Sequence, residues 1–224
     1  MKNRDLPFFT ETLTSEKKIT EEEAARAIYI DFEGFEAREP SLIGISIDTH
    51  FDQIILSPSL KSAAEAKGLS TREGKIFLNE LHSLAINEDR KIVAYSSHEK
   101  EQCQKWYGLD ISGVYVNANL IAKAWYKKTY PSPREKITGL KDYLKLVGVS
   151  RGDYLGVRQT TQRIKAVEDM LERKGSYQLL TAVNKAKWTK LLEHNKIDVE
   201  GMKALVLKAV GSQLKLEIDG SHYP

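Results

Sequence analysis

Short runs of apolar and β-branched residues fill the first half of the chain, a pattern typical of β-strands. Five runs fit it: residues 27–33, 41–48, 51–56, 91–95 and 114–116. The second and third runs are joined only by Thr49 and His50, which predicts a β-hairpin. Residues 57–70 contain Pro58 and Gly68, so we expect a loop there.

Apolar residues at helical spacing follow the hairpin and dominate the second half of the chain. They predict helices at 77–85, 96–107, 120–126, 140–147, 160–173 and 177–210, and residues 212–219 could close as a strand. We therefore predict an α/β fold with a mixed sheet: an antiparallel meander of three strands, then parallel strands reached through helices that flank the sheet. No linker divides the chain, so residues 23–224 are expected to form a single domain preceded by an arm at 1–22.

Composition limits the compartment and the class of protein. The chain has 224 residues, and its single cysteine, Cys103, excludes an internal disulfide framework and a cysteine-rich zinc module. The start lacks the apolar segment of a signal peptide, and no stretch is long and apolar enough to span a membrane. We expect a cytoplasmic protein without a membrane partner.

Charge is unevenly distributed along the chain. Residues 1–120 hold 14 Lys and Arg against 20 Asp and Glu (net −6), residues 121–190 hold 16 against 6 (net +10), and the remainder holds 4 against 5 (net −1), which gives the overall +3. Carboxylates that bind cations and a basic segment that binds a polyanion would produce this distribution. A solvated, lysine-rich helical surface would produce it equally well.

Asp31 and Glu33 lie two residues apart on the first predicted strand, so their side chains share one face. They are close enough to bind one divalent cation, and Mg²⁺ prefers such oxygen ligands. The alternative is that Ile28, Ile30 and Phe32 face the core while the two carboxylates face water.

The segment Ile30-Asp31-Phe32-Glu33-Gly34, followed by a hairpin, resembles the first motif of the DnaQ-like, DEDD-type 3′–5′ exonucleases, which have a ribonuclease H-like fold. The resemblance continues through residues 92–99 and into 191–199, so it covers most of the chain. The last segment is most similar to the predicted ribonuclease H-like exonuclease branch, in which an aromatic residue or histidine precedes Asn-x-x-Asp-Val.

The resemblance implies that Asp31 and Glu33 are the two carboxylates of the first motif and that Asp198 is the carboxylate of the third. The middle motif departs from the family, which has an aspartate after Tyr-Asn-x-x-Phe, whereas this chain has Tyr95-Ser96-Ser97-His98-Glu99. Glu99 is therefore the expected fourth metal ligand, with Asp110 as a distant substitute. Ser96 and Glu99 also fit a helix-capping box, a purely structural alternative.

His194 precedes Asp198 by four residues, one helical turn, so both project from one helix face. The resemblance makes His194 the general base that takes a proton from the attacking water. One family branch has tyrosine at this spacing and the other has histidine one residue earlier. A His–Asp surface pair is the alternative.

The implied reaction is hydrolysis of phosphodiester bonds from the 3′ end of single-stranded DNA or RNA, with two Mg²⁺ or Mn²⁺ ions held by Asp31, Glu33, Glu99 and Asp198. Basic and aromatic residues that follow the last predicted strand are candidates for binding the strand, because lysine and arginine neutralise phosphates and aromatic rings stack on bases. They are Lys123, Trp125, Lys127, Lys128 and Arg134. A helix core is the alternative for Trp125. Two other functions remain open: a ribonuclease H-like endonuclease, and a catalytically impaired nucleic-acid-binding or scaffold protein of the same fold.

Overall fold

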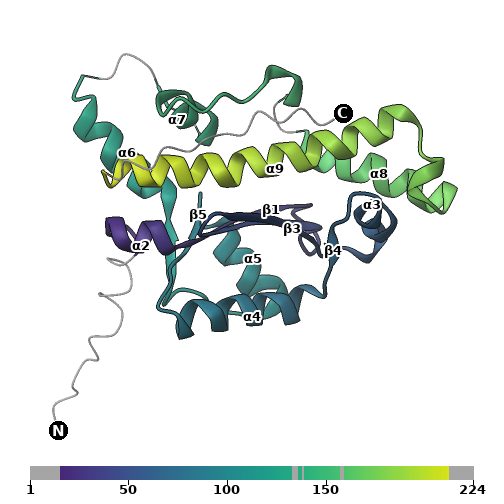
Figure 1. Cartoon of the computed structure of the whole chain (residues 1–224), viewed down its shortest axis with the longest axis horizontal. Coiled ribbons are helices and arrows are strands. Elements are labelled where there is room, and N and C mark those ends of the chain that lie inside the picture. The colour runs from purple at the N-terminus through teal and green to yellow at the C-terminus, as the bar shows by residue number, and fades with distance from the viewer. Residues whose placement is uncertain (1–15, 133–135, 138, 157–158, 212–224) are drawn as a thin grey trace, which may run out of the picture.

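A computed structural model describes residues 16–132, 136–137, 139–156 and 159–211. These residues form a mixed sheet with helices on both faces, as the sequence predicts, and the sheet has six strands where the sequence predicts five (Figure 1). The strands are β1 (Ile28–Glu33), β2 (Leu42–Ile47), β3 (His50–Ile55), β4 (Ser70–Thr71), β5 (Ile92–Ala94) and β6 (Tyr115–Asn117), in the order β4-β3-β2-β1-β5-β6. The first three form an antiparallel meander, and β5 and β6 continue the sheet from β1 in parallel.

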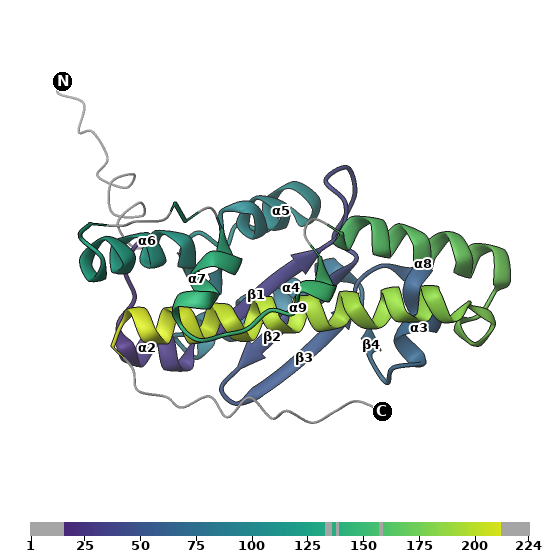
Figure 2. The same ribbon diagram turned by 90° about the horizontal axis from the view of Figure 1, so that it is seen from above.

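The helices are distributed over the two faces of the sheet. Those described are α2 (Glu21–Arg26), α3 (Lys61–Glu65), α4 (Gly74–Asn87), α5 (His98–Tyr107), α6 (Ala118–Thr129), α7 (Leu140–Leu146), α8 (Thr160–Lys174) and α9 (Ala182–Ala209), with short 3-10 turns at Pro58–Leu60, Asp153–Leu155 and Tyr177–Leu179. Helices α4 and α5 cover one face, and α9 crosses the other, where α8 runs beside it (Figures 1 and 2).

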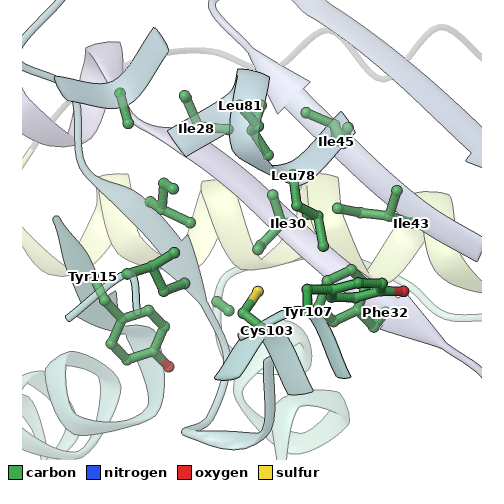
Figure 3. Packing of buried hydrophobic residues seen from close by; sticks show 14 of the residues in the cluster. Ile28, Ile30, Phe32, Ile43, Ile45, Leu78, Leu81, Cys103, Tyr107 and Tyr115 are labelled. Atoms are coloured by element: carbon green, nitrogen blue, oxygen red, sulfur yellow. The ribbon is translucent and has the colours of Figure 1, made fainter. Parts of the chain in front are cut away.

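Both faces of β1 are buried because the strand lies in the middle of the sheet. Ile28, Ile30 and Phe32 pack with Leu78 of α4 and Cys103 of α5 (Figure 3). On the opposite face the residues of β1 lie beneath α9. Residues that alternate along β1 therefore contact two different helical layers, and on the α9 face Tyr29 and Glu33 are buried while Asp31 is partly buried.

Local hydrogen bonds define where the helices begin. Thr20 and Glu23 form a reciprocal capping box at α2: Thr20 N donates to Glu23 Oε2 at 2.8 Å, and Glu23 N donates to Thr20 Oγ1 at 3.1 Å. Thr181 caps the long helix α9 through Asn184 N at 3.3 Å. Helix α2 contacts α9 and spans the boundary that we predict between arm and domain.

Two sequence expectations differ from the structure. Residues 57–70 are not a loop, since Pro58 opens a 3-10 turn that leads into α3, and β4 begins at Ser70. Proline suits the first turn of a helix, where its missing N–H is not needed. The last predicted helix is divided, because the 3-10 turn at 177–179 precedes α9. The strand predicted at 212–219 lies outside the described residues.

Candidate functional site

The two acidic residues of β1 face α9 rather than solvent. Tyr29, on the same face of the strand, packs with Val199 of α9. The Asp31 carboxylate accepts a hydrogen bond from Asn195 of α9, and Glu33 is only 7% exposed. This burial excludes the interpretation in which the pair projects into water.

Asn195 fixes the position of Asp31. Its Nδ2 lies 3.0 Å from the backbone oxygen of Asp31 and 3.0 Å from Oδ2, while its Oδ1 accepts a hydrogen bond from Gln53 Nε2 at 2.9 Å. Gly44 lies opposite Asp31 on β2, and a Cβ at that position would lie 2.1 Å from Asn195 Oδ1. The absence of a side chain on β2 therefore makes room for the amide that orients Asp31.

Glu99 and Asp198 approach the same place from two other elements. Glu99 lies in the first turn of α5 and is 5% exposed, and Asp198 lies in the middle of α9. The pKa of Asp31 is raised well above its usual value, mainly by burial and then by the charges of Glu33, Asp198 and Glu99. The structure thus brings together all four acidic side chains that the sequence proposes for the site.

Burial also perturbs Glu33. It raises the pKa of Glu33 to about 8, and the charge of Asp198 adds to this effect. A hydrogen bond with Thr160, the first residue of α8, and the positive charge of Arg151 act in the opposite direction, while Glu99 raises the pKa further. A carboxylate held in this surrounding needs a cation or a proton for stability.

The surroundings of Glu99 bear on both alternatives that the sequence leaves open, a metal ligand and a helix cap. Burial raises its pKa to about 7, and hydrogen bonds with Ser96 oppose that shift. Glu99 therefore turns back toward Ser96, but the N-cap of α5 is Ser97 and its side chain makes no capping bond. Oε2 of Glu99 is buried and makes no hydrogen bond with any described residue, so it remains open to a further ligand.

His194 lies inside the same site. It is 6% exposed, and its Nε2 lies 3.2 Å from Asp198 Oδ2 and 3.9 Å from Glu33 Oε1. The proposed surface pair of His194 and Asp198 is excluded by this burial. The histidine is adjacent to two of the four carboxylates, as a general base would have to be.

Two arginines that sequence reasoning did not assign to the site complete it. Arg151, in the segment between α7 and α8, places Nη2 2.8 Å from His194 Nδ1 and Nη1 3.5 Å from Asp198 Oδ1. Arg163 of α8 is buried and donates a hydrogen bond to the backbone oxygen of Leu155. It lies close enough to interact electrostatically with Arg151 and Glu33. Arg151 lies in an irregular segment, so no periodicity pointed to it.

The donor set suits a divalent cation that prefers oxygen. Asp198 Oδ1, like Glu99 Oε2, is buried without a hydrogen bond to a described residue, and orphaned carboxylate oxygens of this kind are suited to coordinating a metal. As the side chains stand, however, no group of three His, Cys, Asp or Glu residues among those described converges on one point. Arg151, which contacts Asp198, places a positive charge in this cluster of carboxylates.

Asp110, the substitute for Glu99, does not contribute. It is exposed, and its carboxylate accepts a hydrogen bond from Ser112 N at 2.9 Å. That bond lowers the pKa of Asp110. Among the sites proposed for the fourth carboxylate, only Glu99 lies with the others.

The structure places only some of the residues predicted to bind nucleic acid at a common cavity. A cavity of about 1060 Å³ at the far end of α9, between α2 and α6, is lined by Trp125, Lys128, Lys17, Lys18, Lys91 and Lys208, with Glu23 beside them. Lys123 and Lys127 are exposed on α6 but do not line it, and Arg134 lies outside the described residues. Trp125 is half-buried, its ring is perpendicular to that of Tyr130, and it both packs against a hydrophobic cluster and lines the cavity.

The sequence matches no protein-family model and no curated protein. Within the part of the chain that the structure describes, no helix combines the length and apolar character needed to cross a bilayer.

Proposed function

We propose that the protein is a metal-dependent 3′–5′ exonuclease of the ribonuclease H-like class that hydrolyses single-stranded DNA or RNA. One observation carries the proposal: Asp31, Glu33, Glu99 and Asp198 come from three separate segments and meet in one buried site beside His194. The β3-β2-β1-β5-β6 part of the sheet has the antiparallel and parallel pairings that the ribonuclease H-like resemblance implies.

The four carboxylates would hold the metal ions, and Asp31, fixed by Asn195, is the best oriented of them. When bound, the ions supply activation of the attacking water and stabilisation of the leaving 3′ oxygen. Glu33, beside His194, orients the water, and the His194 imidazole accepts its proton. The buried surroundings strengthen these electrostatic effects by excluding bulk water.

The lysine-lined cavity supports binding of a polyanion. Lys208 is ten residues beyond Asp198 on α9, about 15 Å along the helix axis at 1.5 Å per residue. A strand whose 3′ end lies at the carboxylates could therefore contact the cavity a few nucleotides away. Lysines that neutralise phosphates, together with Trp125, would bind the strand without reading its sequence.

The proposal is tested by incubating the purified protein with 5′-labelled, 3′-labelled and circular strands of DNA and RNA, in Mg²⁺, in Mn²⁺ and in chelator. We expect metal-dependent shortening of linear strands from the 3′ end and intact circles. Asp31→Asn, purified in parallel, controls for contaminating nucleases, and Asp110→Asn is the matched change outside the site.

Three outcomes separate the candidate functions. Loss of cleavage in Asp31→Asn but not in Asp110→Asn assigns the activity to the site. Cutting of circles would replace the exonuclease with an endonuclease. Strand binding without cleavage under any condition would refute catalysis and favour the nucleic-acid-binding protein, for which the arginine among the carboxylates is the structural argument.

A further inference from the structure

The segment between α7 and α8 inserts a positive charge into the carboxylate site. Arg151 is the residue responsible, and its side chain is only 11% exposed. Its guanidinium contacts the His194 ring and the Asp198 carboxylate, and its charge also stabilises ionised Glu33. It therefore interacts with three of the side chains on which the proposed metal chemistry depends.

A second positive charge lies close to Arg151. Arg163 on α8 is buried and oriented by the backbone oxygen of Leu155 and by Gln159 Oε1 at 3.0 Å, and the charge of Arg151 acts unfavourably on it. Arg151 is thus attracted by α9 and β1 and repelled by α8. Nε of Arg151 is buried and makes no hydrogen bond to a described residue, so the guanidinium is not held by a full set of partners.

We propose that Arg151 is an internal counter-cation that neutralises the carboxylates of the metal-free protein and competes with divalent cations for them. The inference rests on the proposed function, since it concerns regulation of the same metal site. Binding of the ions requires the guanidinium to leave Asp198, and the same movement frees the His194 ring to accept a proton. The contact of Arg151 with Asp198 explains why the four acidic side chains lie together although no three His, Cys, Asp or Glu side chains among the described residues converge on one point.

The contacts that hold the Arg151 segment are suited to such a movement. Tyr154 donates a hydrogen bond to Glu193 from an exposed position. Asp153 pairs with Lys141 at 3.6 Å on the surface, where an ion pair contributes little. Leu155 is fully buried and anchors the end of the segment nearer α8. Arg151 can therefore swing from the site while the backbone beyond it stays attached.

The test measures Mn²⁺ affinity of the full chain without substrate, by calorimetry and by the paramagnetic signal of free Mn²⁺. Arg151→Met removes the charge and keeps an unbranched apolar side chain, and we expect it to bind Mn²⁺ about tenfold more tightly than the wild type while the metal-free protein becomes less stable. Arg173→Met, at an exposed position near the end of α8, is the matched control and should leave the affinity unchanged.

A second measurement needs no variant. Hydrogen exchange in residues 149–152 of the wild type, ahead of the Leu155 anchor, should accelerate on adding Mn²⁺ if the ions displace Arg151, and unchanged or slower exchange would oppose the proposal. Equal or weaker Mn²⁺ binding by Arg151→Met overturns the counter-cation while leaving the metal site intact. Absence of Mn²⁺ binding in both the wild type and Arg151→Met overturns the metal site itself, and with it the proposed nuclease.

Discussion

Replacing Glu33 by glutamine should make the metal-free protein more stable at neutral pH. Burial and the neighbouring carboxylates raise the pKa of Glu33 from 4.5 to about 8, so the folded protein binds this proton more tightly than the unfolded chain does. A carboxyl with a raised pKa contributes stability that is fully present below the unfolded pKa and is lost as pH rises through the folded one. The free energy of unfolding therefore falls between pH 4.5 and 8.

The size of this effect follows from the interval between the pKa of Glu33 in the unfolded chain and its pKa in the folded protein. Each pH unit in which the group is protonated only in the folded state lowers the free energy of unfolding by about 1.4 kcal/mol. From pH 4.5 to pH 7 the loss for Glu33 is about 3 kcal/mol, a large part of the stability of a typical domain. Glu33→Gln cannot ionise and should recover that amount at pH 7, with little gain near pH 5.

The assay is urea unfolding in chelator at several pH values between about 5 and 8. We expect the wild-type and Glu33→Gln stabilities to diverge as pH rises, whereas Glu172→Gln, an exposed change on α8, should follow the wild type. Saturating Mn²⁺ should restore stability to the wild type, by about 2.7 kcal/mol at a concentration of 100 Kd, and much less to Glu33→Gln. Parallel curves for the wild type and Glu33→Gln would refute the buried, protonated carboxyl.

Three further predictions concern the site and the basic cavity. Asp31→Asn should abolish cleavage and Mn²⁺ stabilisation while keeping the fold and strand binding, and retained cleavage would remove Asp31 from the mechanism. Gly44→Ala should lower the free energy of unfolding by about 1–3 kcal/mol and reduce Mn²⁺ affinity, because its Cβ overlaps the amide that holds Asp31; an unchanged urea midpoint would contradict the close approach. Joint replacement of Lys128 and Lys208 by alanine should weaken strand binding and flatten its salt dependence by about two phosphate contacts, whereas Lys127→Ala, outside the cavity, should alter the slope less.

The strands were predictable because their signals are local. The alternation on β1 and the β-branched runs of the hairpin specify extended chain that buries one or both faces, and the structure places strands there. The hairpin turn lies one residue earlier than the sequence predicts. Asp48, at a φ of 51°, is in the turn, and His50 is the first residue of β3. The prediction of a loop at 57–70 is wrong. It rests on Pro58 and Gly68 as loop signals, although proline can open a helical turn.

The same distinction between local and tertiary signals decides which residues of the site can be predicted from the sequence. The four carboxylates lie on strands and helices, where the spacing of residues along the element indicates which side chains share a face. Asn195 was visible inside the Asn-x-x-Asp pattern, but its contact with Asp31 depends on how α9 lies across the sheet. Arg151 and Thr160 reach Glu33 only through the tertiary path of the segments around α8, which no periodicity encodes.

The partnership of Asp31 with Asn195 also sets the order in which the site can appear during synthesis. The two residues are 164 positions apart, and a ribosome adding about 5–20 residues per second needs roughly 10–30 seconds to reach the second after the first. Until α9 emerges and docks, β1 carries its acidic pair without the helix that covers it. The nascent chain therefore holds three of the four clustered carboxylates once α5 has formed, and Asp198 joins them only when the sheet and α9 have come together.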